Sequence, residues 1–381
     1  MPDSNLKRLL GDPREIAVER ALAEIRSGRP VVIVDGETRL LTIAVESVDD
    51  AMLALLMETG NAAENNGAVA ENNTARLVLS PPRARLLGFP GPEPAIMALT
   101  GVEANALHEI VSHTGAHLDG QKLEPANDRQ KYALDLVRLA YLLPAAITVP
   151  LASGKAEGVQ HEGMVCVTRE AIRHYLENVI TSLRIVARAP VPLEEVGDTE
   201  FVVFRGGEGM RDQIAVIIGK PNPNEPVYVR LHSACLTGDL FGSLKCDCGD
   251  QLRGTVRNIA EMGGGILLYL DQEGRGSGIA NKIRAYHLQH CGYDTFDADE
   301  ILGFGIDQRR FDFAAAMLRQ LGHTSIRLMT NNPGKVLALQ EAGLDVVSSH
   351  PVKARLTLQN AGYLVAKRDR AGHKIEGDLK T

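Results

Sequence analysis

Three of the five cysteines constrain this chain more than any other feature of its sequence. Cys235, Cys246 and Cys248 fall within fourteen positions, among polar residues and glycines instead of the apolar neighbours of a buried cysteine. Thiolates suit zinc, and a set of three leaves the fourth position of a tetrahedral ion for water, as in a catalytic site. Spacing alone leaves three interpretations open: an open zinc site, a closed zinc site completed by a distant histidine such as His232, and no metal.

The bulk properties predict a soluble chain with more than one core. Its 381 residues exceed one ordinary domain, 44 % of them are apolar, and the net charge is −7. An acidic balance does not favour a nucleic-acid surface, which usually carries a basic face. No apolar run approaches the ~20 residues that span a bilayer, and the N-terminus lacks the apolar segment of a secretory signal. We therefore expect a cytoplasmic protein with neither a nucleic-acid nor a membrane partner.

Strand-like and helix-like segments alternate through both halves of the chain. In the first half we expect helices at 14–27, 132–143 and 169–185, strands at 30–35, 76–80 and 146–151, and a polar loop at 61–73. In the second half we expect strands at 201–204, 214–218, 227–231, 266–270 and 326–329, and helices at 251–262, 311–321 and 335–342. The pattern predicts an α/β protein with mixed sheets. A proline-containing linker at 189–195 would separate two domains, 1–188 and 189–381.

A glycine-rich segment, Gln-Glu-Gly-Arg-Gly-Ser-Gly, follows the expected strand at 266–270. Glycines at the carboxyl end of a strand let backbone N–H groups approach an anion, and Arg275 could bind that anion with two hydrogen bonds. A plain glycine turn is the alternative. On the helix that follows, Lys282 and Tyr286 would share one face, although a solvated face explains the cations nearly as well.

Two further segments carry candidate chemistry. Asp307 stands two residues before Arg309 at the entry to a helix, where it could instead cap that helix. Thr330 and Lys335 flank an Asn-Asn-Pro-Gly turn after a strand, where ligands of α/β folds collect and where Thr330 and Lys335 would suit phosphate oxygens. A structural turn is the alternative there.

Taken together and in this order, the segments from about 192 to 373 resemble the GTP cyclohydrolase II family. The resemblance rests on Cys-Leu-Thr-Gly-Asp, Cys-Asp-Cys-Gly, Gln-Glu-Gly-Arg, Asn-Lys-Ile-Arg-Ala-Tyr, Gly-Tyr-Asp-Thr, Leu-Gly-Phe and Leu-Met-Thr-Asn-Asn-Pro. It implies zinc-dependent hydrolysis of GTP to 2,5-diamino-6-(5-phosphoribosylamino)pyrimidin-4(3H)-one, with release of formate and pyrophosphate, as the first step of riboflavin biosynthesis.

The resemblance also implies a role for each matched residue. Cys235, Cys246 and Cys248 would bind zinc. Asp307 would accept a proton, and Tyr286 would lie near the reacting centre. Arg309 matches an arginine assigned in the family as a nucleophile toward the α-phosphate, but a group with a pKa above ~12 is better suited to binding and charge stabilisation. Contacts to GTP would come from Arg230, Leu231, His232, Ser233, Ala234, Gln251, Glu273, Gly274, Arg275, Thr295, Thr330 and Lys335. Magnesium would accompany the triphosphate, and the protein would be a homodimer.

Four positions depart from the family pattern: Ala234, Asp271, Arg310 and Gly334. Asp271 and Arg310 each reverse a frequent charge, and we hypothesise that they form a swapped ion pair. These departures motivate two alternatives to the leading function. One is a paralogous zinc hydrolase acting on a different nucleotide or base, and the other is a non-catalytic GTP-binding sensor.

The first half faintly resembles 3,4-dihydroxy-2-butanone-4-phosphate synthase. The acidic cluster that would hold magnesium after the strand at 30–35 is missing, because Leu40, Leu41 and Ile43 stand in that stretch. The synthase's second metal motif has no counterpart either, since Asn-Asp-Arg-Gln stands at 127–130. We expect a degenerate synthase-like domain without synthase activity, serving structure, dimerisation or regulation.

Overall fold

The chain forms two compact units in a computed structural model that describes residues 11–64, 74–118, 120–151, 163–194, 196–207, 211–305, 307–352, 356–357 and 359–374. One unit comprises Met1–Val179 together with Asp297–Ile306, and the other comprises Ile180–Phe296 together with Asp307–Thr381. The first unit thus ends nine residues before the predicted boundary at 188/189, and it includes a segment from the middle of the second half that the sequence did not lead us to expect.

The first unit is built on a seven-stranded sheet with the order β5-β4-β3-β6-β2-β1-β7. All neighbours pair antiparallel except β1 and β7. Its strands are β1 (Val31–Asp35), β2 (Thr38–Ala44), β3 (Arg76–Leu79), β4 (Ala95–Ala98), β5 (Glu124–Pro125), β6 (Ala145–Leu151) and β7 (Cys166–Thr168). Its helices are α2 (Pro13–Arg26), η1 (Val45–Ser47), α3 (Asp50–Glu64), α4 (Pro81–Leu86), α5 (Ala104–Ser112), α6 (Asp128–Leu139) and α8 (Arg169–Asn178).

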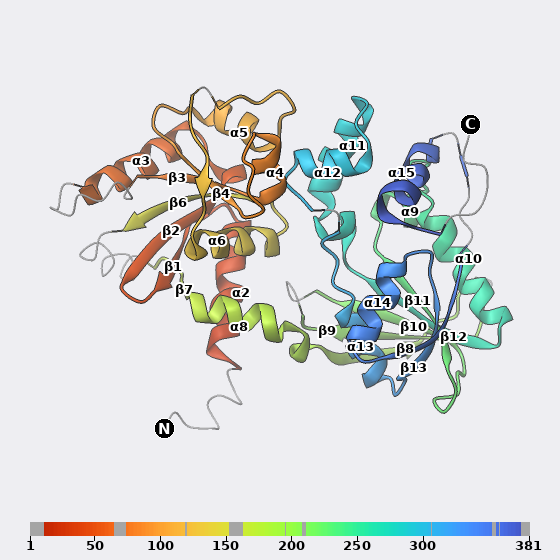
Figure 1. Cartoon of the computed structure of the whole chain (residues 1–381). Helices are drawn as coiled ribbons and strands as arrows, with labels where there is room; N and C mark the ends of the chain where they lie inside the picture. The colour runs from red at the N-terminus through yellow and green to blue at the C-terminus, as the bar shows by residue number, and fades with distance from the viewer. Residues whose placement is uncertain are drawn as a thin grey trace, which may run out of the picture. The chain divides into compact units, whose positions relative to one another are not determined.

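Local signals and burial explain these elements. Asp12 accepts the Arg14 N–H at 2.9 Å and Pro13 occupies the first turn, a favourable start for α2. Helices α2, α6 and α8 pack against one another (Figure 1). Leu134 of α6 lies in a buried cluster with Val78 of β3 and Ile96 of β4, which fixes α6 on the sheet.

The second unit also has a seven-stranded sheet, with the order β14-β13-β11-β12-β10-β9-β8. The four strands from β14 to β12 are parallel, and β10, β9 and β8 continue the sheet antiparallel. Its strands are β8 (Arg184–Pro190), β9 (Thr199–Arg205), β10 (Gln213–Gly219), β11 (Val227–Ser233), β12 (Gly264–Leu270), β13 (Ser325–Met329) and β14 (Asp345–His350). Its helices are α9 (Leu236–Asp239), α10 (Cys248–Glu261), η4 (Glu273–Gly276), α11 (Ile279–His290), α13 (Asp312–Gln320), α14 (Pro333–Glu341) and α15 (Ala361–Ala371). Two short helices cross the division between the units, η2 (Val179–Ser182) and α12 (Thr295–Ile301).

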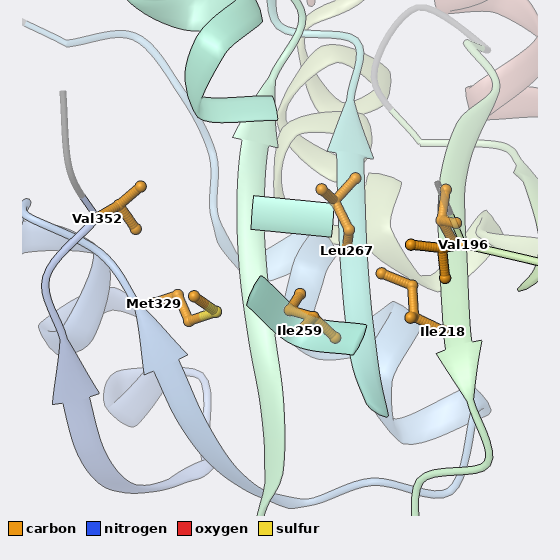
Figure 2. Packing of buried hydrophobic residues seen from close by; sticks show 7 residues of the cluster. Val196, Ile218, Ile259, Leu267, Met329 and Val352 are labelled. Carbon is orange, nitrogen blue, oxygen red and sulfur yellow. The ribbon is translucent and has the colours of Figure 1, made fainter. Parts of the chain in front are cut away.

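Helix α10 covers one face of this second sheet (Figure 2). Its fully buried Ile259 packs in a cluster with Leu267 of β12, Ile218 of β10 and Met329 of β13. Burying side chains of this size stabilises the fold by roughly 1.5–3 kcal/mol each before entropy is counted. The cluster fixes the last turns of α10 on this face of the sheet.

The predicted α/β class with mixed sheets is confirmed, and the expected strands are all present. The helix expected at 169–185 is wrong in its last part, because α8 ends at Asn178 and Arg184–Pro190 forms β8 beside β9. Ala189 and Pro190 of the expected linker belong to that strand. The polar loop expected at 61–73 begins late, since α3 continues to Glu64, and its remainder lies outside the described residues. No helix in the described part of the chain is long and apolar enough to cross a membrane.

Candidate active site

The topology of the second sheet brings distant motifs to one edge. Strands β11, β12 and β13 are parallel, and β11 lies between the other two. Cys235 follows β11, Glu273 follows β12 and Thr330 follows β13. Because the carboxyl ends of parallel strands meet at the same edge, these segments come together there, where α/β folds bind ligands.

The three cysteines converge at this edge. Their Sγ atoms all lie within 4.8 Å of one another, and those of Cys235 and Cys246 are 3.5 Å apart. Gly238 of α9 lies against the sulfurs, and a Cβ built there would be 2.6 Å from the Cys246 Sγ. Three soft sulfur donors around one point fit zinc, and among the described residues this is the one cluster of three or more metal-ligating side chains.

Hydrogen bonds and a cation favour the thiolate at Cys235. Hydrogen bonds from the Cys246 and Cys248 thiols lower its pKa well below the usual range, and the Lys282 ammonium, with Nζ at 3.0 Å from Sγ, acts in the same direction. Lys282 also donates to the Glu273 carboxylate at 2.7 Å. Burial opposes its charge, but these two partners raise the pKa of Lys282 above its ordinary value. A thiolate rather than a thiol is the form that binds a metal ion.

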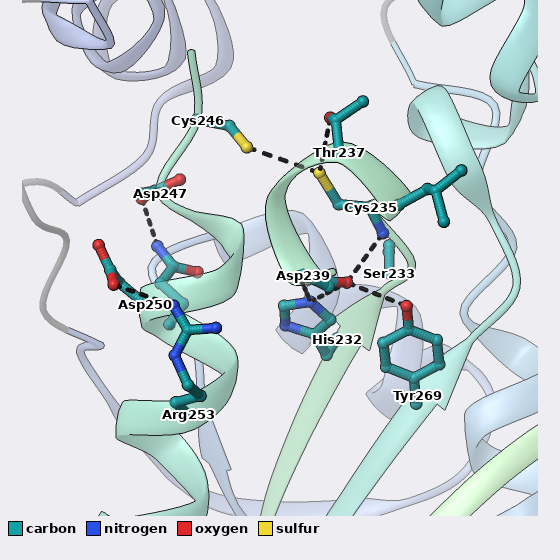
Figure 3. A network of polar contacts seen from close by, with 12 residues as sticks. His232, Ser233, Cys235, Thr237, Asp239, Cys246, Asp247, Asp250, Arg253 and Tyr269 are labelled. Carbon is teal, nitrogen blue, oxygen red and sulfur yellow. Dashed lines mark hydrogen bonds and ion pairs between the residues drawn. The ribbon is translucent and has the colours of Figure 1, made fainter. Parts of the chain in front are cut away.

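The buried carboxylate of Asp239 orients the backbone of Cys235 (Figure 3). Asp239 accepts hydrogen bonds from the Cys235 N–H at 2.9 Å, the Tyr269 hydroxyl at 3.0 Å and the His232 Nε2 at 3.1 Å. Burial lowers the pKa of His232 and keeps the imidazole neutral, although Asp239 favours its protonation. His232 is therefore engaged with Asp239 and does not join the sulfur cluster, so the geometry favours an open set of three ligands over a closed site completed by this histidine.

The glycine-rich segment forms a tight bend at the end of β12. Gly274 and Arg275 both have positive φ, 61° and 58°, and this conformation is costly for the non-glycine residue. The bend places the Arg275 guanidinium 4.3 Å from the centre of the Phe296 ring. Glu273 accepts the Leu236 N–H at 2.6 Å, which ties the bend to the helix after Cys235.

Cations gather beside the sulfur cluster. The Lys335 ammonium is buried and donates to the Leu231 carbonyl at 2.9 Å, and the buried Arg230 donates to the Gln251 side chain at 2.6 Å. Burial, with Arg309 and Arg230 nearby, lowers the pKa of Lys335 well below its ordinary value. Lys367 of α15 adds to the same effect and forms an ion pair with Asp247 at 3.3 Å. A buried amine among several other cations, only some of which have acidic partners, is typical of an anion-binding site.

Asp307 and Arg309 form a close pair next to these cations. The Arg309 Nε donates to the Asp307 Oδ1 at 2.8 Å, and the Arg309 Nη1 lies 3.4 Å from the Ser233 hydroxyl. Burial favours the neutral acid, but Arg309 outweighs it and lowers the pKa of Asp307. Helix α13 begins at Asp312 with Phe311 as its N-cap, so Asp307 does not cap it.

Known proteins are similar to this chain over part or nearly all of its length. A family model described as GTP cyclohydrolase II matches residues 184–351. A protein of Xylella fastidiosa (strain 9a5c) named GTP cyclohydrolase-2 is 43 % identical over 97 % of this chain and 89 % of its own length. The chain belongs to the GTP cyclohydrolase II family. It is therefore an enzyme of a hydrolase family.

Other relatives differ in how much of the chain they match. GTP cyclohydrolase-2 of Azospirillum brasilense is 42 % identical over 94 % of this chain and 93 % of its own length. GTP cyclohydrolase-2 of Shewanella piezotolerans is 44 % identical over 51 % of this chain, yet that match covers 94 % of the relative. A solved structure of RibBX, a two-domain 3,4-dihydroxy-2-butanone 4-phosphate synthase from A. baumannii, covers 89 % of this chain and 99 % of its own at 17 % identity, with a TM-score of 0.32. That score is too low to support an inference about either unit.

Most residues expected from the GTP cyclohydrolase II pattern lie in this region. Thr330 accepts the Asn332 N–H at 3.0 Å and so also shapes its turn. The Tyr286 hydroxyl lies 3.5 Å from the Thr237 hydroxyl, and the Lys282 ammonium lies 5.6 Å from the centre of its ring. The described contacts bring Phe296, and not the neighbouring Thr295, against Arg275.

The hypothesised ion pair between Asp271 and Arg310 is wrong. Asp271 pairs with Arg211 at 2.9 Å, and Arg310 pairs with Asp312 at 2.7 Å. Each reversed charge is therefore compensated by an opposite charge, Asp271 by Arg211 before β10 and Arg310 by Asp312 two positions away.

Three residues of the site received no role from the sequence: Asp239, Lys282 and Lys367. Asp239 stands in the Cys-Leu-Thr-Gly-Asp motif, and a buried acid beside a candidate ligand could have indicated an orienting role. Lys282 was expected only as a cation on a helix face, and Lys367 lies more than a hundred positions after the cysteines.

Proposed function

We propose that this protein hydrolyses GTP with zinc bound at Cys235, Cys246 and Cys248, as the first step of riboflavin biosynthesis. The observation that carries the proposal is the position of the sulfur cluster beside buried cations at the carboxyl ends of β11, β12 and β13. A nucleoside triphosphate has both features that such a site would serve, a ring to hydrolyse and a chain of phosphates to hold. A name shared by relatives that match nearly the whole chain supports GTP as that substrate.

The proposed reaction consumes three waters. Two are added at C8 of guanine, one for each C–N bond that breaks, and C8 leaves as formate. The third splits the anhydride between the α- and β-phosphates and releases pyrophosphate. The remaining product is 2,5-diamino-6-(5-phosphoribosylamino)pyrimidin-4(3H)-one.

The chain's own residues prepare both parts of this chemistry. Zinc held by three thiolates would supply a Lewis acid and lower the pKa of a bound water toward neutrality. Asp239 fixes the backbone of Cys235 for that purpose. The Tyr286 hydroxyl stays protonated because burial raises the pKa of its phenol, so it can donate a hydrogen bond near the reacting centre.

Asp307 and Arg309 would act as a linked pair. While Arg309 is bonded to Asp307, it lowers the pKa of that carboxylate and makes it a weak base. When the guanidinium turns to the α-phosphate, the carboxylate loses its partner and its pKa rises, so Asp307 becomes a better proton acceptor. Arg309 would then stabilise charge at the phosphate that is cleaved. We assign Arg230, Arg275 and Lys335 to the remaining phosphates, with magnesium bound to the triphosphate.

Two of the residues that differ from the family pattern have contacts that favour GTP over a different nucleotide. Asp271 and Arg310 are each paired within the protein, so neither presents an uncompensated reversed charge to the substrate. The close Asp307–Arg309 pair and the clustered cysteines also favour a hydrolase over a silent sensor, since binding alone requires no metal. We further propose a homodimer, which light scattering of the full chain would test.

The decisive experiment incubates the zinc-loaded protein with GTP and Mg²⁺ and quantifies formate and pyrophosphate. We expect equal amounts of both, and we expect neither from Cys248→Ser, which retains two of the three sulfurs. Tight GTP binding with neither product would contradict the proposed reaction and favour a sensor. Products from another nucleotide alone would favour the paralogue.

A further inference from the structure

The segment 297–306 belongs to the first unit, although Phe296 and Asp307 on either side of it belong to the second. Within the first unit this segment is well packed. Ala298, Leu302 and Phe304 are all at most 4 % exposed. The first unit therefore contains the described part of the segment that leads to Asp307 and Arg309.

The end of α12 has a defined turn. Phe304 N–H donates to the Asp299 carbonyl at 2.8 Å, and Gly303 N–H donates to the Glu300 carbonyl at 2.9 Å, the two bonds of a glycine-terminated helix end. Gly303 has φ of 82°, and a Cβ there would lie 2.7 Å from the Ser80 Oγ. Only glycine suits both the backbone conformation and this close approach.

Two buried side chains of the first unit bind the carbonyls of that turn. The Ser80 hydroxyl, before α4, donates to the Gly303 carbonyl at 2.6 Å. Arg83 of α4 donates through Nη1 to the Ile301 carbonyl at 3.1 Å. Both side chains are buried, with exposed fractions of 6 % and 3 %.

Arg83 joins the carboxyl ends of two helices. Besides Ile301 at the end of α12, it donates to the carbonyls of Ile110 at 2.7 Å, His113 at 2.6 Å and Glu109 at 3.2 Å, at the end of α5. Carbonyls in the last turn of a helix have few partners within it, although that of Glu109 also accepts the His113 N–H at 2.9 Å. The negative end of each helix dipole favours a cation there. Arg83 thus connects the ends of α12 and α5 through four hydrogen bonds to main-chain carbonyls.

In the second unit, both flanks of the same segment contact the Arg275 bend. Phe296 lies under the Arg275 guanidinium at 4.3 Å, and the Gln308 N–H donates to the Arg275 carbonyl at 3.1 Å. A Cβ at Gly276 would lie 3.1 Å from Gln308. A change in the path of 297–306 would therefore reach Arg275, Asp307 and Arg309 through the covalent chain.

We propose that Ser80 and Arg83 are positioning residues of the hydrolase site, acting through α12 and Gly303 on the Asp307–Arg309 pair. The N-terminal unit is then a working part of the hydrolase. The effect on turnover rests on the proposed function, but the effect on the local order of 307–311 does not. That difference allows the two proposals to fail separately.

The test compares full-length Ser80→Ala and Arg83→Met with matched controls from the same unit. Ser27→Ala removes a hydroxyl that bonds only within α2 and its cap, and Arg26→Met removes a guanidinium bonded to the Ala140 carbonyl. We expect kcat for formate release to fall about fivefold in Ser80→Ala, the loss of one neutral hydrogen bond, and further in Arg83→Met. Zinc content should stay at the wild-type level, and the change in kcat should exceed any change in KM.

Hydrogen exchange of the peptide 307–311 gives a readout that requires no activity. The Gln308 N–H should exchange faster in Ser80→Ala and Arg83→Met than in either control. Unchanged exchange together with unchanged kcat would overturn the proposal. If wild-type protein releases no formate, the exchange result alone decides it, and if Arg83→Met does not fold, Ser80→Ala decides it.

Discussion

At the scale of single residues, Gly238 sets the spacing of the three sulfurs that we propose bind zinc. A methyl group there would meet the Cys246 Sγ at 2.6 Å and the Cys235 Sγ at 3.0 Å. Gly238→Ala should therefore spread the sulfurs, abolish stoichiometric zinc binding and remove formate release. Gly254→Ala is the matched control, because a Cβ at that glycine of α10 meets no atom within 4 Å. Metal analysis of the two purified variants checks this, and normal zinc content in Gly238→Ala would refute it.

At the same scale, the protonation of Lys335 should change when a polyphosphate binds. Its pKa is lowered by burial and by Arg309 and Arg230, and a bound polyphosphate would offset those cations and raise it. Binding should therefore add protons to Lys335, up to about one per site, and the uptake should grow as pH rises because more of the free amine is neutral. Calorimetry with pyrophosphate, which cannot turn over, in buffers of different ionisation enthalpy measures this uptake. Lys335→Met should lack the pH-dependent part, and equal uptake in both proteins would exclude Lys335.

The sequence predicted the sulfur cluster better than the cation cluster, for a physical reason. Cys235, Cys246 and Cys248 are close along the chain, so few folds could separate them. Lys367 and Arg230 meet only because β11 lies between β12 and β13 and because α15 returns to that edge, and local sequence does not encode strand order. The hypothesised Asp271–Arg310 pair was wrong because each residue has a nearer partner.

At the scale of elements, residues 127–130, which stand where the synthase has a metal motif, form the start of α6. Asn127 accepts the Gln130 N–H at 3.2 Å, and the Gln130 side chain accepts the Asn127 N–H at 2.9 Å, a complete capping box. Asn127→Ala should lower the free energy of unfolding of the first unit by about 1 kcal/mol, and Asn127→Ser should restore most of it. Urea unfolding measures the difference. Formate release should not change in either variant, and a selective loss of activity in Asn127→Ala would indicate a role beyond the cap.

Element boundaries show where sequence patterns reach their limit. The sequence predicts a helix over 169–185, but α8 ends at Asn178 because Arg184–Pro190 gains a ladder of hydrogen bonds with β9. Tertiary pairing overrides helix propensity there. Local sequence patterns also could not predict that 297–306 belongs to the first unit. Ser80 and Arg83, which bind this segment, lie more than two hundred positions earlier.

At the scale of the whole molecule, the two units have different relations to the GTP cyclohydrolase II family. Half of this chain covers 94 % of the Shewanella piezotolerans relative, so the family does not require a chain of this length. The Xylella and Azospirillum relatives match over both halves. If the first unit lacks synthase activity, as the sequence predicts, the proposed anchoring of the segment before Asp307 explains why such chains keep it.

The first unit should accordingly make no 3,4-dihydroxy-2-butanone 4-phosphate from ribulose 5-phosphate. Leu40, Leu41 and Ile43 are buried in β2, where their side chains offer no oxygen to a hard cation. Asp35, at the end of β1, is committed to ion pairs with Arg129 at 2.9 Å and Arg169 at 3.5 Å. The described residues of this unit contain no group of three or more metal-ligating side chains. Incubating the full chain with ribulose 5-phosphate and Mg²⁺ checks the expectation, beside a formate assay on the same sample to show that the protein is folded. Magnesium-dependent product would mean that other residues bind the metal, and anchoring would no longer be the sole explanation for this unit.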